Sequence, residues 1–123
     1  MVYKTIISAD DLKVNLDNDN FLIFDSRCDI KDSGYGIDSY TEGHIPNSIF
    51  IDVDTDLASE KRPGTGRHPL PDPNTFSEKL SHWGMSNSKQ VVVYDDAGGA
   101  FAGRLWWMLK WLGHEAVAVL DGG

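Results

Sequence analysis

The sequence of 123 residues contains a single cysteine, Cys28, and its excess of acidic over basic residues gives a formal net charge of −8. One cysteine excludes an internal disulfide and any metal site built from several cysteines. The negative charge disfavours nucleic acid as a partner, because binding to phosphates requires clustered Lys and Arg. We therefore expect no nucleic-acid partner, no metal and no organic cofactor.

Long hydrophobic runs are also missing from the sequence. No segment approaches the ~18 consecutive apolar residues that a membrane-spanning helix needs. The first residues, Met1-Val-Tyr-Lys-Thr5, lack the apolar core of a signal peptide. We expect a protein that has no membrane partner and is located in the cytoplasm.

The composition, with 41% hydrophobic and 24% charged residues, is that of an ordinary globular protein. Its length predicts one domain over residues 1–123. The chain ends with Val117-Ala-Val-Leu-Asp-Gly-Gly123, two glycines after an expected core strand. Because a helix usually covers such a strand, we expect the chain to be a fragment of a longer protein.

The stretch from Gln90 to Gly113 organises the rest of the chain. It begins with a β-branched run, Val91 to Tyr94, that is typical of a strand covered on both faces. A Gly-rich loop follows, and then a long apolar helix that ends at Gly113. Ligands of open α/β sheets bind beyond the carboxyl ends of strands, so the loop from Asp95 to Gly99 marks the expected crevice. The start of the helix offers N–H groups to an anion, yet the residues there are Asp95 and Asp96.

The remaining elements alternate between strands and helices. We expect strands at 21–24, 48–51 and 116–120, a short helix opened by the capping box of Ser8, and a helical turn at 39–42. Another helix is expected before Gly84, with Asp72 or Asn74 as its N-cap. This pattern predicts an α/β fold with three layers, in which helices flank a mainly parallel sheet of about five strands.

Several motifs come in an order that resembles one family. They are Asp25-Ser26-Arg27, Glu42-Gly-His-Ile-Pro46, Ile51-Asp-Val-Asp54, the Val-Val-Tyr-Asp end of the central strand, Arg104-Leu-Trp-Trp-Met108 and Leu120-Asp-Gly-Gly123. Together they resemble the N-terminal rhodanese domain of a two-domain thiosulfate or 3-mercaptopyruvate sulfurtransferase. The resemblance covers nearly the whole chain. It implies a rhodanese-like fold and a C-terminal catalytic domain as partner in the same chain.

The resemblance also implies where the chemistry of that family lies. The C-terminal domain carries a cysteine in a loop whose N–H groups stabilise a thiolate, which takes a sulfur atom from the donor as a persulfide. The equivalent position here is Asp95, and a carboxylate cannot carry that sulfur. We therefore expect this domain to be inactive by itself, as the scaffold and wall of a cleft for a small anionic sulfur donor.

Two roles are open to Arg27. The resemblance places it where the catalytic domain has an arginine that binds the anionic donor. Beside Asp95 and Asp96 it is instead expected to form an ion pair that tethers the loop, and we favour this second role. Arg67 and His68, in the Gly64-Thr-Gly-Arg-His68 loop, are further candidates for contact with the donor, although a solvated loop explains them equally well.

His44 is the candidate for an accessory role. In the mercaptopyruvate branch of the family the matching histidine belongs to a proton relay with an upstream aspartate, for which Asp38 and Asp32 both remain open here. The alternative, which we favour, is that His44 only fastens its turn by hydrogen bonds. Cys28, the single thiol, has no Gly-rich cradle around it, so we interpret it as a small semi-buried residue.

Other motifs fail on single positions. Asp52-Val-Asp-Thr-Asp56 is not an EF-hand because Leu57 stands where the loop requires glycine, and we interpret it as a solvated acidic turn. Gly98 to Gly103 lacks the lysine of a P-loop.

The long helix is apolar nearly all round, which predicts burial on both sides. Trp107 and Trp111 share one face and are candidates for an interface.

The sequence thus predicts the non-catalytic N-terminal half of a sulfurtransferase, with cyanide or a thiol as sulfur acceptor. It does not separate thiosulfate from 3-mercaptopyruvate as donor. A second hypothesis is a free-standing inactive rhodanese module that binds a protein partner through the tryptophan face.

Overall fold

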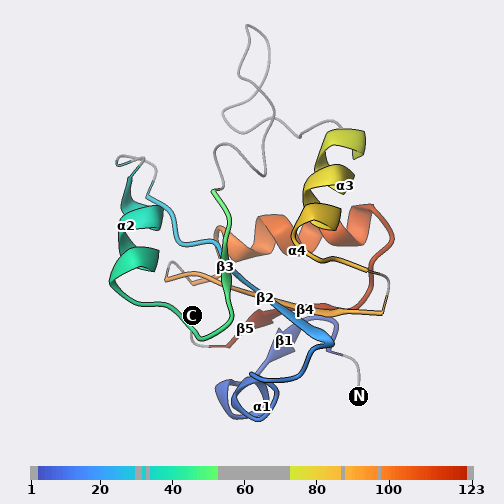
Figure 1. Ribbon diagram of the computed structural model, residues 1–123, viewed down its shortest axis with the longest axis horizontal. Coiled ribbons are helices and arrows are strands. Elements are labelled where there is room, and N and C mark those ends of the chain that lie inside the picture. Colours follow the sequence, from blue (N-terminus) through green and yellow to red (C-terminus); the bar gives the residue numbers. More distant parts are fainter. Residues whose placement is uncertain are drawn as a thin grey trace, which may run out of the picture.

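The computed structural model describes residues 3–29, 32, 34–52, 73–86, 88–96 and 98–121. In this part of the chain a single sheet holds five strands, all parallel, in the order β1-β5-β4-β2-β3 (Figure 1). The strands are β1 (Ile6–Ile7), β2 (Phe21–Asp25), β3 (Ile49–Phe50), β4 (Gln90–Tyr94) and β5 (Val117–Leu120). The predicted α/β class and mainly parallel sheet of about five strands are confirmed.

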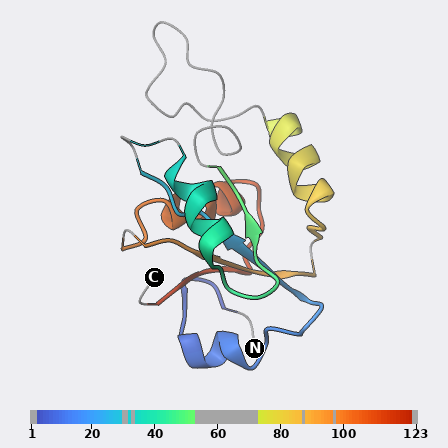
Figure 2. The same ribbon diagram turned by 60° about the vertical axis from the view of Figure 1, so that its left-hand side comes forward.

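Four helices flank the sheet: α1 (Ala9–Lys13), α2 (Tyr35–Glu42), α3 (Pro73–His82) and α4 (Ala102–Trp111). Helix α1 lies on one side of the sheet, and α3 and α4 lie on the other, as both ribbon views show (Figures 1 and 2). Helices on both faces make the three layers that alternating strands and helices predicted.

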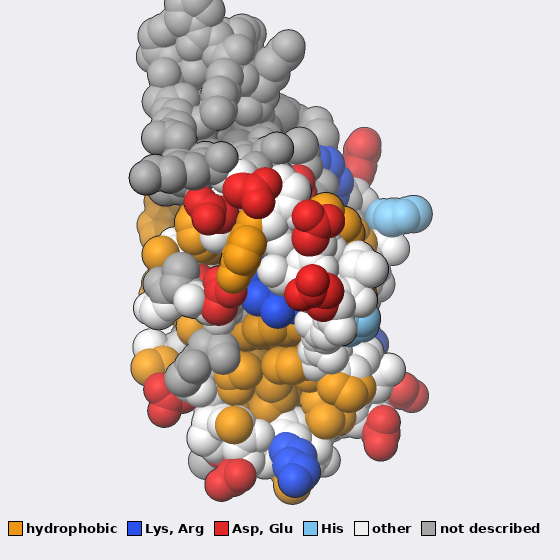
Figure 3. Space-filling view, turned by 90° about the vertical axis from the view of Figure 1, so that its left-hand side faces the viewer, with side chains coloured by type: hydrophobic (Ala, Val, Ile, Leu, Met, Phe, Trp, Pro, Cys, Tyr) orange, Lys and Arg blue, Asp and Glu red, His pale blue; other side chains and the backbone are white. Residues whose placement is uncertain are grey.

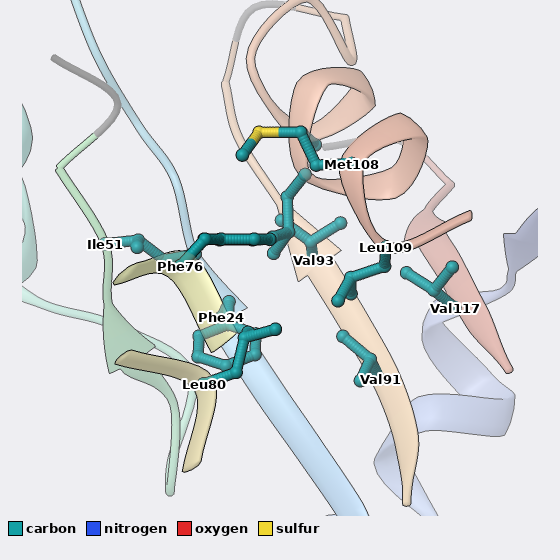
Figure 4. Close-up of a cluster of buried hydrophobic side chains, with 11 residues drawn as sticks. Phe24, Ile51, Phe76, Leu80, Val91, Val93, Met108, Leu109 and Val117 are labelled. Carbon is teal, nitrogen blue, oxygen red and sulfur yellow. The ribbon is translucent and has the colours of Figure 1, made fainter. Parts of the chain in front are cut away.

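The central strand β4 is buried along its whole length. Because successive side chains of a strand point to opposite faces, β4 contributes to two cores. Val91 and Val93 face α3 and α4, where they pack with Phe24, Phe76 and Leu109 (Figure 4). Val92 and Tyr94 face the α1 side, where their cluster includes Ile7, Leu12, Ile23, Ala118 and Leu120. This double burial explains the continuous β-branched run.

Helix α4 packs on the sheet with one side, and its other side carries the two tryptophans that were predicted as an interface. Ala102, Leu105, Met108 and Leu109 are buried against the sheet. Trp107 and Trp111 are 48% and 44% exposed, and their rings stack with centroids 6.0 Å apart. Within this chain the helix is therefore buried on one side only, because no element among those described covers its tryptophan face.

Three boundaries also differ from the sequence expectations. The helical turn expected at 39–42 is the end of a longer helix, α2, that starts at Tyr35. Asn74 lies inside α3 and is not its N-cap, while the alternative cap, Asp72, lies outside the described residues. Strand β1 was missed, since two residues are too few to show a period. Ser8 is confirmed as the N-cap of α1, since its hydroxyl accepts a hydrogen bond from the Asp11 amide at 3.1 Å, which is one of the two bonds of a capping box.

Helix α2 approaches the end of β2 through Gly36. A Cβ atom at this position would lie 2.2 Å from the carbonyl oxygen of Arg27 and 2.9 Å from the ring of Phe50. Only glycine allows this close approach. The approach brings α2 against the carboxyl edge of the sheet, where the polar residues of the chain converge.

Candidate functional site

The candidate site lies at the carboxyl ends of β2 and β4, where open parallel sheets bind their ligands. Strand pairing places Asp25, the last residue of β2, beside Tyr94, the last residue of β4. Asp95 follows directly. Asp25 is 0% exposed and Asp95 is 2% exposed, so the ends of two neighbouring strands each carry a buried carboxylate.

The Asp95 carboxylate occupies a cradle of backbone N–H groups. Its Oδ1 atom accepts a hydrogen bond from the Gly99 amide (2.9 Å), and its Oδ2 atom accepts bonds from the amides of Phe101 (2.9 Å) and Ala102 (2.8 Å). Gly98 and Gly99 adopt left-handed conformations, with φ of 69° and 92°, that turn the chain toward the carboxylate. The cradle adjoins the start of α4, where the helix dipole also favours negative charge.

Such a cradle is the kind of structure that binds an external anion or stabilises a thiolate. Here the chain supplies the anion itself, because the Gly99, Phe101 and Ala102 amides donate to Asp95. The sequence predicted an anion-binding architecture with a carboxylate in it. The structure adds that both carboxylate oxygens accept hydrogen bonds from the cradle.

The Asp25 carboxylate is met mainly by side chains, and its Oδ1 atom also accepts one bond from the Arg27 amide at 2.9 Å. Arg27 donates from Nε (3.1 Å) and Nη2 (2.7 Å) to Oδ2, and the Tyr94 hydroxyl donates to the same oxygen (3.0 Å). The hydrogen bonds with Asp25 raise the pKa of Arg27 above its ordinary value. Burial raises the pKa of the Tyr94 hydroxyl.

The expected ion pair of Arg27 with Asp95 or Asp96 is wrong. Arg27 pairs with Asp25, two residues before it, because Asp25 presents its carboxylate at the same strand end. Asp96 is exposed and accepts a hydrogen bond from the Tyr35 hydroxyl, which raises the pKa of Tyr35. Arg27 therefore tethers the chain, as we favoured, but it tethers another segment: its Nη2 atom donates to the carbonyl of Gly43 at 2.6 Å.

His44 lies in the turn that follows α2 and is exposed. Its Nδ1 atom is 2.7 Å from the carbonyl oxygen of Tyr40, and its ring stacks on the Tyr40 ring with centroids 3.7 Å apart. These contacts fasten the turn, as the favoured interpretation required. The partner they give the imidazole is a carbonyl oxygen, whereas the relay hypothesis requires the carboxylate of Asp38 or Asp32.

The remaining predicted residues are Cys28, those of the 64–68 loop and the acidic turn, and the two tryptophans. Cys28 is half-buried and packs against the core cluster on the α3 and α4 side. Arg67, His68 and the acidic turn that begins at Asp52 fall in or run into residues 53–72, which lie outside the described part of the chain. Trp107 and Trp111 lie on the outer face of α4. Their roles stay predictions.

An apolar groove of about 290 Å³ adjoins the turn of His44. It is lined by Ala9, Leu12, Lys13, Leu16, Ile45, Pro46 and Leu120. Figure 3 shows a hydrophobic patch on this side of the molecule, with acidic side chains gathered above it. Since Lys13 is the one charged residue of its lining, the groove offers little to a small anion.

Sequence reasoning missed the roles of Asp25, Tyr94 and Tyr40. The signal for Asp25 was a charged residue that directly ends an apolar run, as in Phe21-Leu-Ile-Phe-Asp25. Within the described ranges, no group of three or more His, Cys, Asp or Glu is placed to bind a metal ion. No helix in the same ranges is long and apolar enough to cross a bilayer.

A parallel sheet flanked on both faces by helices, with a loop of backbone N–H donors after its central strand, defines a three-layer α/β domain. The sequence model of the rhodanese-like domain matches residues 8–123. The chain belongs to the rhodanese-like domain family.

Several proteins that are similar to this chain are sulfurtransferases. The chain is 46% identical over 120 residues to a probable 3-mercaptopyruvate sulfurtransferase of Pseudomonas aeruginosa, covering 96% of this chain and 42% of that protein. It is 33% identical to the 3-mercaptopyruvate sulfurtransferase of Escherichia coli, covering 95% and 41%. The structure of the Leishmania major 3-mercaptopyruvate sulfurtransferase superposes with a TM-score of 0.85 at 34% identity, covering 98% of this chain and 33% of that one. The chain thus spans less than half the length of each.

Proposed function

We propose that this chain is the non-catalytic, N-terminal rhodanese-like half of a two-domain sulfurtransferase. The single observation that carries the proposal is the Asp95 carboxylate, which fills the N–H cradle where a persulfide-forming cysteine is required. A carboxylate has no sulfur to accept the outer sulfur of a donor. The parent protein would take thiosulfate or 3-mercaptopyruvate as donor and cyanide or a thiol as acceptor, in the cytoplasm.

The chain's own residues support a role as scaffold and cleft wall. Arg27, the cation nearest to the strand ends, is engaged by Asp25 and by the Gly43 carbonyl, which leaves it poorly placed to bind a donor. Cys28 is half-buried and packs against the core cluster on the α3 and α4 side, and it is not the residue that follows the central strand. The persulfide cysteine and most contacts with the donor would come from a C-terminal catalytic domain, with Arg67 and His68 as further candidates.

A second candidate function is a free-standing inactive rhodanese module that binds a protein partner. The observation that favours it is the exposed, stacked pair of Trp107 and Trp111. Large aromatic side chains are enriched at protein interfaces, and two of them on one helix face make a compact docking patch. The same patch would serve a catalytic domain of the same chain, so the patch alone does not separate the two functions.

The test is sulfur transfer by the 123-residue chain, with Cys28→Ser as its control. Thiocyanate formation is measured with cyanide and either thiosulfate or 3-mercaptopyruvate, and intact mass after donor treatment reports any added sulfur atom. We expect no thiocyanate above the control and no added sulfur, while circular dichroism shows that both proteins are folded. Turnover that Cys28→Ser abolishes would refute the proposal and identify Cys28 as a nucleophile.

A further inference from the structure

The turn that carries His44 is held on both sides of the histidine by residues from two neighbouring strand ends. Before it, the Gly43 carbonyl accepts a hydrogen bond from Nη2 of Arg27 at 2.6 Å. After it, the Ile45 amide donates to the Tyr94 hydroxyl at 3.1 Å. The peptide groups that flank His44 are thereby fixed to the carboxyl edge of the sheet, although the histidine itself is exposed.

The buried carboxylate of Asp25 sets the direction of both bonds. A tyrosine hydroxyl has one proton to donate, and that of Tyr94 goes to Asp25 at 3.0 Å, so its lone pairs are left to accept from Ile45. Asp25 also holds the guanidinium of Arg27, and the Nη2 atom that bonds Asp25 also donates to the Gly43 carbonyl. Asp25, Arg27 and Tyr94 form one unit, which we name the strand-end cluster.

The imidazole of His44 has a defined tautomer in this arrangement. Its Nδ1 atom lies 2.7 Å from the carbonyl oxygen of Tyr40, and a carbonyl oxygen only accepts, so Nδ1 must carry the hydrogen. In the neutral ring Nε2 is then the proton acceptor. The stack on Tyr40, with an interplanar angle of 8°, fixes the plane of the ring.

We propose that Tyr94, together with Asp25 and Arg27, is a positioning residue that holds the turn of His44 so that the imidazole keeps its Nδ1–H tautomer and presents Nε2 as a proton acceptor. The group with which His44 would exchange a proton, in a catalytic domain facing this edge, rests on the proposed function above. The positioning itself belongs to this chain and can be tested in it.

The test is Tyr94→Phe in the 123-residue chain, examined by nuclear magnetic resonance. The substitution keeps the buried ring and removes the hydroxyl, which accepts from the Ile45 amide, donates to Asp25 and lies 3.4 Å from the Ser48 hydroxyl. We expect the exchange of the Ile45 amide with solvent to accelerate about five- to tenfold, which is the effect of one lost hydrogen bond. We also expect the His44 side chain to change from mainly Nδ1–H toward a mixture of tautomers in its proton–nitrogen correlation spectrum.

Two internal references make the result specific. The Nε2 atom of His114 lies 2.9 Å from the Lys89 carbonyl, so His114 should show the opposite tautomer, Nε2–H, in both proteins. The matched variant is Tyr35→Phe, which removes a tyrosine hydroxyl that donates to Asp96. We expect it to leave the Ile45 amide and the His44 tautomer unchanged.

A folded Tyr94→Phe protein in which both His44 and the Ile45 amide behave as in the original chain would overturn the inference. If Tyr94→Phe does not fold, Arg27→Lys tests the same unit, since lysine keeps the charge but cannot span Asp25 and the Gly43 carbonyl. An unchanged His44 tautomer in that folded variant would equally overturn it. Sulfur transfer by the chain alone would refute the proposed function and leave these spectra unaffected, so the two failures are distinguishable.

Discussion

Asp25 and Asp95 are two buried carboxylates at the carboxyl ends of neighbouring strands, and their surroundings differ in kind. Asp25 is held mainly by the side chains of Arg27 and Tyr94, with one further hydrogen bond from the Arg27 amide. Asp95 is held by three backbone amides, from Gly99, Phe101 and Ala102. One carboxylate thus depends on what the neighbouring residues are, and the other depends on the path that the backbone takes.

This difference determines what happens to the hydrogen-bond donors when either carboxylate is substituted. Side-chain partners can be replaced together with the carboxylate, and Tyr94 also titrates. Backbone amides remain whatever residue follows the strand, so removal of Asp95 leaves donors that need another acceptor. The loop geometry around Asp95 therefore suits a carboxylate and would also suit another anion at the same position. The surroundings of Asp25 depend on the particular side chains of Arg27 and Tyr94.

The largest effect that this comparison predicts is that of Asp95→Ala. Three buried or half-buried amides lose an ionised acceptor, and we expect the free energy of unfolding to fall by about 3 kcal/mol. Urea unfolding followed by circular dichroism measures this loss. Added sulfate or phosphate should restore part of the stability, because an external anion can then enter the emptied cradle.

The control for Asp95→Ala is Asp96→Ala at the next position. Asp96 is exposed, and it bonds Tyr35 at the surface. We expect its loss to cost about 0.5 kcal/mol or less, with no response to added anion. Equal losses from the two variants would contradict the distinction between a cradle carboxylate and a surface one.

A smaller effect is expected from the pair of Asp25 and Arg27. In a double-mutant cycle with Asp25→Asn and Arg27→Gln, we expect a coupling free energy of about 1–2 kcal/mol, because each substitution removes the charged partner of the other residue. The measurement is again urea unfolding, of the two single variants and the double variant.

The matched cycle combines Arg27→Gln with Asp95→Ala. Because Arg27 pairs with Asp25 in the structure, we expect these two losses to add within about 0.5 kcal/mol. A coupling of Arg27 to Asp95 as large as that to Asp25 would restore the ion pair expected from the sequence and remove the contrast between the two carboxylates.

The cradle could be predicted from the sequence because its signals are local. A β-branched run from Val91 to Tyr94, glycines after it and an apolar helical pattern fix the strand, the loop and the helix without reference to distant residues. Asp95 follows the strand directly, which placed it at the crevice. Its inward direction needed the structure, since sequence alone also allowed a partner outside the loop.

The strand-end cluster could not be predicted, because its contacts depend on tertiary structure. Asp25 meets Tyr94 only through the register of β2 against β4, and those residues are 69 positions apart. Arg27 had acidic neighbours in several segments, and spacing does not rank them. The tryptophan face of α4 shows the same limit: the all-round apolar pattern predicts that both sides of the helix are covered, and Trp107 and Trp111 were candidates for an interface, but the pattern does not say which element covers each face.

The smallest expected effect is a pH dependence of stability that comes from Tyr94, the hydroxyl partner of Asp25. Burial raises the pKa of Tyr94 above its ordinary value of 10.0, so the folded protein keeps this proton at a pH where the unfolded chain has released it. Stability from this source is fully present below about pH 10 and is lost as the pH rises through the folded pKa. The stability difference between the original chain and Tyr94→Phe should therefore shrink from pH 8 to pH 11. The pKa values of Tyr3 and Tyr35 are also raised, but both residues are present in the two proteins, so their contributions cancel in the difference. If the urea midpoints of the two proteins keep a constant difference from pH 8 to pH 11, then deprotonation of Tyr94 does not contribute to the loss of stability at high pH.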